Sequence, residues 1–315
     1  MLPPVRDVPD IVRRIALTRG SEGVEWLHGL DALVVDLERQ WGVQVGRSLS
    51  GATEAFVAEA RTADGELAVL KVAMPGRNPM SNQARTLIAA AGKGYARVYR
   101  YDEPRRALLL ERLGMELFQF GLPTDAQIRT ICRSLEEAWQ TPIGELNLPT
   151  GADRARALGG LIEDLWLSLG KPCHERIVET AIRYAELRAN AFNVEASVLV
   201  HGDAHAWNTL KTPGDNSRFK LIDPEGVVAE RACDLGVSMR EWRSELLAGD
   251  PLDLGRRRCA LLSRLTTVPA EPIWQWGLLE CVSNGLLFLQ EGDGEEGAAS
   301  LAIAAAWVPL SSRDE

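Results

Sequence analysis

Three things are scarce in this sequence: positive charge, paired cysteines and long apolar runs. Lys and Arg number 35 against 44 Asp and Glu, and the resulting formal charge of -9 argues against nucleic acid and anionic membranes as partners. The five cysteines are scattered and none stands in a C-x-x-C pair, so neither a disulfide framework nor a cysteine-based zinc site is expected. The longest apolar stretch, residues 301–310, is too short to span a bilayer.

No secretion signal is expected, because the first residues lack a basic segment followed by an apolar one. What is present is the composition of an ordinary globular protein, with 46% hydrophobic and 25% charged residues. A chain of 315 residues is long enough to form two lobes around substantial cores. We therefore expect a cytoplasmic protein, a monomer or a weak dimer, that binds neither nucleic acid nor membrane.

Hydrophobic periodicity predicts a strand-rich part at the start of the chain. Residues 1–42 show helical spacing, and the period then shortens to that of strands. The strands are predicted at residues 43–49, 55–60, 67–74, 95–101 and 107–113. Between the third and fourth strands, a helix is predicted with Ser81 as its N-cap and a stop at Gly92 or Gly94.

From Thr124 onward the pattern is helical almost throughout. Thr124 and Gln127 predict a capping box, and Arg256–Arg258 are expected on a solvated face. Further helices are predicted near residues 154–169, 174–191, 228–247, 252–266, 272–290 and 295–306. The order predicts an α+β, bilobal, protein-kinase-like fold, with a small antiparallel-sheet lobe over residues 1–113 and a larger, mostly helical lobe over residues 114–315.

The stretch with the strongest chemical signal lies between two strand-like apolar runs in the second half. It contains the spacing His-x-Asp-x-x-x-x-Asn, made by His201, Asp203 and Asn208, and Asp223 follows Asn208 by fifteen residues. Phosphoryl transfer requires one carboxylate at the acceptor hydroxyl, and an amide oxygen with a second carboxylate to hold magnesium against the nucleotide phosphates. A lone His-x-Asp occurs often by chance, but the joint pattern between two strands predicts a kinase.

The strand-rich part supplies candidates for binding the nucleotide. Ser50, Gly51 and Thr53 form a small-residue loop whose backbone N–H groups could cover a triphosphate, although an ordinary glycine-turn hairpin is the alternative. Lys71 stands alone in an apolar strand, as the strand lysine of kinases does. An inward-facing lysine is costly unless an anion meets it, and a nucleotide phosphate is such an anion; an outward-facing lysine is the alternative.

Two further features concern the same part of the chain. No acidic residue occurs between Lys71 and Tyr101, so the glutamate that usually steadies the lysine is absent, and Gln83 is the best-placed substitute. The last strand ends at Glu111–Gly114, which includes Leu113. We expect this segment to be the hinge whose backbone groups meet the purine edge.

Taken together, the motifs resemble those of a known family. The chain is similar over nearly its whole length to the aminoglycoside phosphotransferases, in the branch of streptomycin 6-kinases and hydroxyurea or peptide-antibiotic phosphotransferases. The resemblance rests mainly on His201-Gly-Asp203-Ala-His205 with Asn208, on Ile222-Asp223-Pro-Glu225, and on Asp234-Leu235. It departs from the usual pattern in Ala204, where leucine is common, and in Gln83, where many relatives carry glutamate.

The resemblance implies ATP or GTP and Mg²⁺ as cofactors, and it implies roles for individual residues. Asp203 would be the catalytic base, while Asn208 and Asp223 would bind magnesium. Lys71 would contact the α- and β-phosphates, and residues 50–53 would lie over the nucleotide.

The same resemblance assigns supporting roles. Asp234 and His201 would brace the catalytic loop, and His205 would do the same.

The expected acceptor is a small hydroxyl compound that carries positive charge. Desolvated guanidinium or ammonium groups must be paired, so carboxylates are needed around the acceptor. Glu225 is one candidate, and Glu291 with Asp293 are others, although the latter two could form a solvated turn. We expect an ATP-dependent O-phosphotransferase of the streptomycin type, with a peptide antibiotic, hydroxyurea or an amino sugar as the alternative acceptor.

Two other classes of function compete with a kinase. A metal-dependent hydrolase would use His201, Asp203, His205 and Asp223 as ligands, but it leaves Lys71 unexplained. A non-catalytic nucleotide- or drug-binding protein on the same fold is suggested by the missing glutamate.

Overall fold

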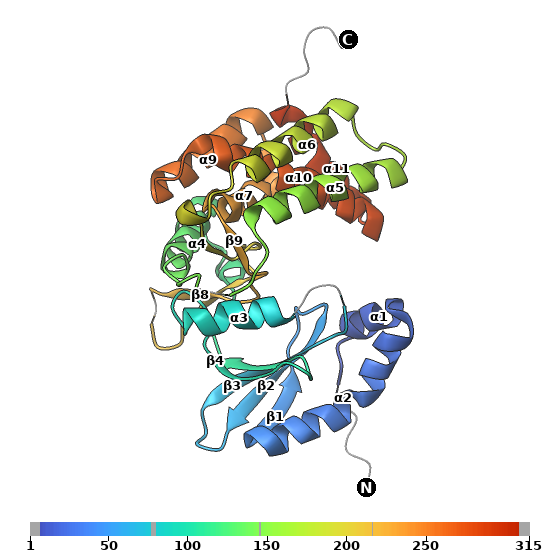
Figure 1. Ribbon diagram of the computed structural model, residues 1–315, viewed down its shortest axis with the longest axis vertical. Coiled ribbons are helices and arrows are strands. Elements are labelled where there is room, and N and C mark those ends of the chain that lie inside the picture. The colour runs from blue at the N-terminus through green and yellow to red at the C-terminus, as the bar shows by residue number, and fades with distance from the viewer. Residues whose placement is uncertain (1–6, 77–79, 145, 216, 309–315) are drawn as a thin grey trace. The chain divides into compact units, whose positions relative to one another are not determined.

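The computed structural model describes residues 7–76, 80–144, 146–215 and 217–308 (Figure 1). Residues 1–6, the start of the segment without a secretion-signal pattern, lie outside these ranges. So do residues 309 and 310, the last two of the apolar stretch 301–310. The chain forms two compact units, the first made of Met1–Gly114 and Lys211–Lys220 and the second of Met115–Leu210 and Leu221–Glu315. Among the described residues, no helix is long and apolar enough to cross a membrane.

A five-stranded antiparallel sheet in the order β1-β2-β3-β5-β4 forms the centre of the first unit. Its strands are β1 (Val43–Ser48), β2 (Ala55–Thr62), β3 (Leu67–Ala73), β4 (Val98–Asp102) and β5 (Ala107–Glu111). The helices of this unit are α1 (Asp10–Thr18), α2 (Gly20–Trp41) and α3 (Met80–Ala90), and Figure 1 shows α3 lying over the sheet.

One face of this sheet is buried by the N-terminal helices. Val34 and Leu37 of α2 pack in one core cluster with Phe56 of β2 and with Leu70 and Val72 of β3. Because side chains alternate along a strand, residue 71 of β3 belongs to the opposite face. The alternation therefore separates the packing face of the sheet from the face that carries the predicted nucleotide lysine.

The second unit is mostly helical. Its helices are α4 (Thr124–Ala138), α5 (Gly151–Ser168), α6 (Glu175–Asn190), α7 (Ala232–Arg240), α8 (Arg243–Leu247), α9 (Pro251–Thr266), α10 (Ala270–Glu291) and α11 (Gly294–Trp307), with short 3-10 turns at Leu117–Phe120 and Val194–Ala196. Helix α10 packs against α5, α6, α7, α9 and α11, which is why it is apolar on nearly every side.

Two glycines allow α7 and α10 to approach closely. A Cβ at Gly236 would lie 2.6 Å from Cβ of Trp276, and one at Gly277 would lie 2.7 Å from Cβ of Met239. Any larger residue would push the two helices apart. The close approach brings the polar residues one turn further along each helix, Arg240 and Glu280, into contact.

Short strands frame the loop that carries the kinase-like spacing. Strand β6 (Val198–Val200) pairs antiparallel with β9 (Val227–Ala229), and β7 (Thr209–Lys211) pairs with β8 (Phe219–Leu221). The expected single helix at 228–247 is therefore wrong: it is the strand β9 followed by α7 and α8. The apolar run at 227–229 is used to pair with β6, and a short apolar run does not distinguish a buried strand from a helix.

Three smaller expectations are also wrong. Thr124 and Gln127 do not form a capping box, because Thr124 Oγ1 donates to Glu245 and Gln127 Nε2 donates to the carbonyl of Leu122. Ser81 is not an N-cap, because α3 already includes Met80. Arg258 is not on a solvated face: it is 7% exposed and donates to the carbonyls of Met239 and Glu241.

Candidate active site

The catalytic loop candidate, residues 201–208, leaves β6 through a sharp turn at Gly202. This glycine has φ +88°, and a Cβ there would lie 2.9 Å from Oε2 of Glu225 and 3.4 Å from Nη1 of Arg154. Glycine avoids both the left-handed strain and these clashes. The loop backbone can therefore lie against the Arg154 and Glu225 side chains.

His201 is fully buried, and both of its ring nitrogens are hydrogen-bonded. Its Nε2 lies 2.7 Å from the carbonyl of Ile222 and donates to it, while Nδ1 accepts from the N–H of Asp203 at 3.1 Å. The carbonyl of His201 accepts from the N–H of Glu225 at 2.8 Å. Burial lowers the pKa of His201, which keeps the ring neutral with the proton on Nε2. These bonds tie the loop to the segment that contains Asp223.

Asp234 lies in the first turn of α7 and is fully buried. Its Oδ1 accepts from the N–H of Gly202 at 2.7 Å, and its Oδ2 accepts from the N–H of His201 at 3.1 Å and from Nε1 of Trp139 at 2.8 Å. Burial raises its pKa, and the three donors oppose that rise. Three hydrogen bonds satisfy a buried carboxylate that would otherwise be very unfavourable.

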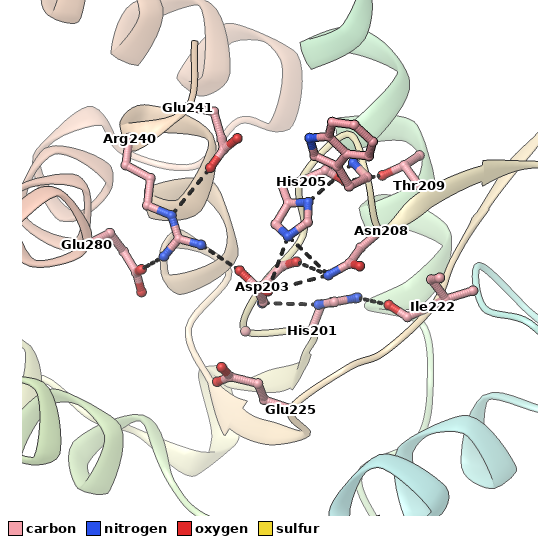
Figure 2. A network of polar contacts seen from close by, with 12 residues as sticks. His201, Asp203, His205, Asn208, Thr209, Ile222, Glu225, Arg240, Glu241 and Glu280 are labelled. Atoms are coloured by element: carbon pink, nitrogen blue, oxygen red, sulfur yellow. Dashed lines mark hydrogen bonds and ion pairs between the residues drawn. The ribbon is translucent and has the colours of Figure 1, made fainter. Parts of the chain in front are cut away.

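The carboxylate of Asp203 is held from two sides (Figure 2). Nη2 of Arg240 donates to Oδ1 at 2.6 Å, and Nε2 of His205 lies 3.3 Å from Oδ2. Burial alone would raise the pKa of Asp203, but His205 and Arg240 outweigh it and lower the pKa. The side chain remains 32% exposed, so an ionised carboxylate is available to a molecule from solvent.

His205 and Asn208 complete the loop. Nδ1 of His205 accepts from the N–H of Trp207 at 3.2 Å, which directs Nε2 toward Asp203. Burial lowers the pKa of His205, but the contact with Asp203 outweighs it and raises the pKa. Nδ2 of Asn208 donates to the carbonyl of Asp203 at 3.0 Å, an arrangement that identifies Oδ1 of Asn208 as its remaining acceptor atom.

Asp223 follows the same framework. The N–H of Ile222 donates to the carbonyl of Asn208 at 3.0 Å, and the carbonyl of Ile222 accepts from His201. Asp223 itself has φ +57°, a left-handed conformation that is uncommon for a non-glycine residue and is concentrated at functional sites. An amide oxygen and a carboxylate are ligands that Mg²⁺ prefers, and Mg²⁺ takes its other ligands from nucleotide phosphates and water. Asn208 and Asp223 therefore fit a magnesium ion.

The hydrolase alternative finds less support in this geometry. Both ring nitrogens of His201 and of His205 already make polar contacts, with the loop or with the carbonyl of Ile222. Within the described ranges, no group of three or more His, Cys, Asp or Glu residues is arranged to hold a metal ion.

Sequence reasoning missed a buried set of charges beside the loop. Glu280 of α10 accepts from Arg154 of α5 and from Arg240 of α7, and Arg154 also pairs with Glu225. Nε of Arg240 lies 3.5 Å from Oε1 of Glu241 (Figure 2). One signal could have found Glu280: it is a lone carboxylate in the apolar stretch of α10, where an ion needs a partner.

The predicted acceptor residues lie at two places in the second unit. Glu225 remains 44% exposed beside Arg154, and desolvation raises its pKa against the pull of that arginine. Glu291 is the exposed last residue of α10. Asp293 is exposed as well and is the N-cap of α11, where its side chain accepts from the N–H of Glu296 at 3.3 Å.

The predicted nucleotide residues of the first unit occupy the sheet and its loops. Lys71 lies in β3 opposite Val57 and Leu108, and Gln83 lies in the first turn of α3. Ser50, Gly51 and Thr53 are exposed in the loop between β1 and β2, and Gly51 has φ +100°.

The predicted hinge is partly engaged in bonds of its own. The N–H of Glu111 donates to the carbonyl of Arg97 at 2.8 Å, and that of Gly114 donates to the carbonyl of Lys211 at 2.7 Å. The carboxylate of Glu111 accepts from Nζ of Lys220 at 2.7 and 2.9 Å. The N–H of Glu111 is therefore not available to a purine in this structure. Leu113 is buried, with 3% of its surface exposed.

A sheet unit with a strand lysine and a helical unit with this loop define a kinase-like phosphotransferase. Comparison with known proteins agrees. The model of the aminoglycoside/hydroxyurea antibiotic resistance kinase family matches residues 40–292, and the chain belongs to this family. It is 24% identical over 305 residues to the streptomycin 6-kinase of Streptomyces griseus, covering 95% of this chain and 96% of that one. It is 28% identical over 259 residues to the hydroxyurea phosphotransferase of Kitasatospora aureofaciens, covering 78% and 74%.

Among solved structures, the choline kinase LicA of Streptococcus pneumoniae matches with a TM-score of 0.59 at 16% identity, covering 89% of this chain and 99% of that one. This likeness confirms the predicted protein-kinase-like fold. Family membership confirms the predicted enzyme class, a phosphotransferase that acts on a hydroxyl group of its acceptor. It also supports the use of a nucleotide as phosphoryl donor.

Proposed function

We propose that this protein is an ATP-dependent O-phosphotransferase whose acceptor is a small cationic antibiotic, an aminoglycoside of the streptomycin type. The observation that carries the proposal is the arrangement of Asp203. It is a partly exposed carboxylate, kept ionised by Arg240 and His205, and it lies next to an asparagine whose amide oxygen can face a metal ion. A general base, a metal ligand and fixed spacing between them are what phosphoryl transfer to a hydroxyl demands.

In this mechanism Asp203 accepts the proton of the acceptor hydroxyl as its oxygen attacks the γ-phosphorus of ATP and the bond to the β-phosphate oxygen breaks. The proton stays on a carboxylate oxygen of Asp203 until it is transferred to solvent water. Asn208 and Asp223 would hold Mg²⁺, which neutralises charge on the phosphate oxygens when bound. His201 and Asp234 keep the loop backbone in place through their hydrogen bonds.

For the nucleotide we propose Lys71 and the loop at residues 50–53. The lysine stands on the face of the sheet opposite the α2 core, and it would contact the phosphates as a fixed positive charge. Replacing Lys71 by alanine should raise the KM for ATP at least tenfold. The matched control is Arg61→Ala, since Arg61 is an exposed cation on the neighbouring strand β2 and it donates to the carbonyl of Gly65.

The charges beside Asp203 support a cationic acceptor. In the described part of the chain, four carboxylates, those of Asp203, Glu225, Glu241 and Glu280, pair with the guanidinium groups of Arg154 and Arg240, and Arg258 lies near Glu241 as a third. A surplus of negative charge attracts a cation and pairs with its desolvated amino or guanidino groups. Glu225 is the exposed member of this set, and we propose that it meets the acceptor directly.

The test is a screen for acceptor-dependent ADP release with ATP and Mg²⁺. The panel should contain streptomycin, other aminoglycosides, a cationic peptide antibiotic, hydroxyurea and amino sugars, each beside a no-acceptor blank. Strong release with streptomycin-type compounds supports the proposal, and mass spectrometry should show a product heavier by one phosphoryl group. Release only with hydroxyurea or a peptide would favour that acceptor instead. No release with any compound would leave a non-catalytic binding role.

The free cysteines and the use of ATP also fit a cytoplasmic enzyme. Fractionation of cells that produce the protein would test this location.

A further inference from the structure

One buried carboxylate joins two arginines behind the catalytic loop. Glu280 is 2% exposed, and its two oxygens accept from Nη2 of Arg154 at 3.0 Å and from Nη1 of Arg240. Each arginine is 12% exposed. Three helices, α5, α7 and α10, each contribute one of these charges. None of the three residues belongs to the local spacing that predicted the loop.

Both arginines also donate hydrogen bonds to the catalytic loop. Nη2 of Arg154 donates to the carbonyl of Gly202 at 2.7 Å, and Nη2 of Arg240 donates to Oδ1 of Asp203 at 2.6 Å. One arginine therefore holds the backbone before the catalytic base, and the other holds the base itself. Figure 2 shows the second of these connections, running from Glu280 through Arg240 to Asp203.

We infer that Arg240 is a positioning residue for phosphoryl transfer: anchored by Glu280, it fixes Oδ1 of Asp203 and leaves Oδ2 as the oxygen that meets the acceptor hydroxyl. This inference rests on the proposed function, because it gives Arg240 a task in that reaction. Arg240 touches neither acceptor nor nucleotide in this scheme and acts only through Asp203.

The contacts of the two carboxylate oxygens support this division. Oδ1 accepts a short, charge-assisted bond, whereas the contacts of Oδ2 with His205 and Asn208 are longer, at 3.3 and 3.4 Å. A carboxylate can turn about its last torsion unless one oxygen is held. The rigid guanidinium can bond Glu280 and Asp203 at the same time through different nitrogens, which a lysine ammonium does less well.

Helix α7 sets the position of Arg240. Asp234 in its first turn binds the N–H groups of His201 and Gly202, and Arg240, six residues later, binds the side chain of Asp203. Six residues of helix advance about 9 Å, so the two ends of one rigid helix hold the backbone and the side chain of the same loop.

The C-terminal end of α7 is fixed in turn by Arg258. This buried arginine donates to the carbonyls of Met239 and Glu241, and burial lowers its pKa to about 10. Helix α7 ends at Arg240, because Glu241 after it is extended, with φ -77° and ψ 167°. The bonds of Arg258 to the backbone on either side of Arg240, and the ion pair with Glu280, together fix the position of Arg240.

A purely structural role is the alternative, since removing one partner of a buried ion pair destabilises the fold. The chain contains a matched control for it. Arg188 of α6 is 13% exposed and pairs with Glu230 at 3.3 Å, so its burial and its type of partner resemble those of Arg240. A structural role predicts similar behaviour for both arginines.

The experiment compares wild type with Arg240→Ala, Arg240→Lys and Arg188→Ala, using the acceptor that gives the strongest ADP release. We expect kcat to fall about 100-fold in Arg240→Ala, because misplacement of a catalytic group costs on that order, while the KM for ATP changes less than threefold. Arg240→Lys should recover part of kcat, and millimolar guanidinium chloride should raise kcat of Arg240→Ala at least fivefold. Arg188→Ala should keep wild-type kcat and show no guanidinium rescue.

The inference is overturned if folded Arg240→Ala keeps kcat within threefold of wild type, or if guanidinium has no effect. Failure of the proposed function looks different, because wild type would then release no ADP with any acceptor. A crystal structure of Arg240→Ala gives a readout independent of the acceptor. The Asp203 carboxylate should be rotated or occupy two conformers there, and an unchanged carboxylate would overturn the inference. If Arg240→Ala does not fold, Arg240→Lys serves for both measurements.

Discussion

Two ion pairs, one from each unit, differ in their exposure more than in their length. In the first unit, Arg47 and Glu59 lie 3.1 Å apart with side chains 78% and 34% exposed. In the second unit, Arg154 and Glu280 lie 3.0 Å apart with side chains 12% and 2% exposed. An exposed pair contributes little to stability because water and salt screen it. A buried pair requires desolvation of both ions, so its presence beside Asp203 points to a task other than holding the fold together.

The largest effect on kcat should come from replacing Asp203, the proposed general base beside these buried charges. In Asp203→Asn, kcat should fall about 1,000-fold, within the range that general base catalysis contributes. The amide keeps the size of the side chain, so the Kd for ATP, measured by calorimetry with Mg²⁺, should stay within threefold of wild type. Near-wild-type kcat in this variant would show that Asp203 is not the general base. The buried charges would then have no catalytic group to position.

For Asp234, the effect should be on the stability of the fold. Asp234→Asn places an NH₂ group among three donors, those of His201, Gly202 and Trp139, in a fully buried site. We expect the free energy of unfolding to fall by about 3 kcal/mol. Urea unfolding followed by circular dichroism measures it. Asp293→Asn is the matched control, since this exposed N-cap should tolerate the change; equal losses in both variants would contradict the contrast between buried and exposed carboxylates.

The loop could be predicted from the sequence because its chemistry is local. Asp203 and Asn208 lie five residues apart, so their spacing alone sets their relation once the flanking strands form. Arg154, Arg240 and Glu280 come from three helices, and Arg240 reaches Glu280 where α7 and α10 approach closely through Gly236 and Gly277. No periodicity reports which charged residue of one helix faces which of another, and this explains why these partners were missed.

The same physical limit applies to the short elements. Strand β9 is three residues long and forms because β6 offers it a partner, which is information from another part of the chain. Glu111 shows it again: its carboxylate accepts from Lys220, 109 residues away, a partner that no local pattern indicates. Long apolar elements such as α10 carry their own signal, and α10 was predicted to within a few residues.

A smaller effect should appear at alkaline pH, and it belongs to the second unit, which contains all five cysteines. Burial raises the pKa of Cys132 to about 12 from the ordinary value of 9.0. The folded state therefore keeps this thiol protonated where the unfolded state ionises it. Its contribution to stability is complete below pH 9 and is lost as the pH rises toward 12; by pH 10 the loss is about 1.4 kcal/mol.

The measurement is the free energy of unfolding in urea at pH 8 and pH 10, for wild type and for Cys132→Ala. Other groups titrate equally in both proteins, so the difference between them isolates Cys132. The difference should shrink by about 1.4 kcal/mol on going to pH 10. A difference that does not depend on pH would show that this thiol is not buried as the structure has it.

The smallest effect should come from the exposed pair of the first unit. Arg47 lies 3.1 Å from Glu59, but solvent reaches 78% of its side chain, and Glu59 has a second cation, Arg112, at 3.5 Å. In Arg47→Met the pair is lost, and Glu59 keeps both water and Arg112. We expect no measurable change in the urea midpoint at physiological salt, and none in kcat. A clear loss of stability here would mean that exposure does not determine what this pair and the Arg154–Glu280 pair contribute, and the reason for assigning a special task to Arg240 and Glu280 would weaken with it.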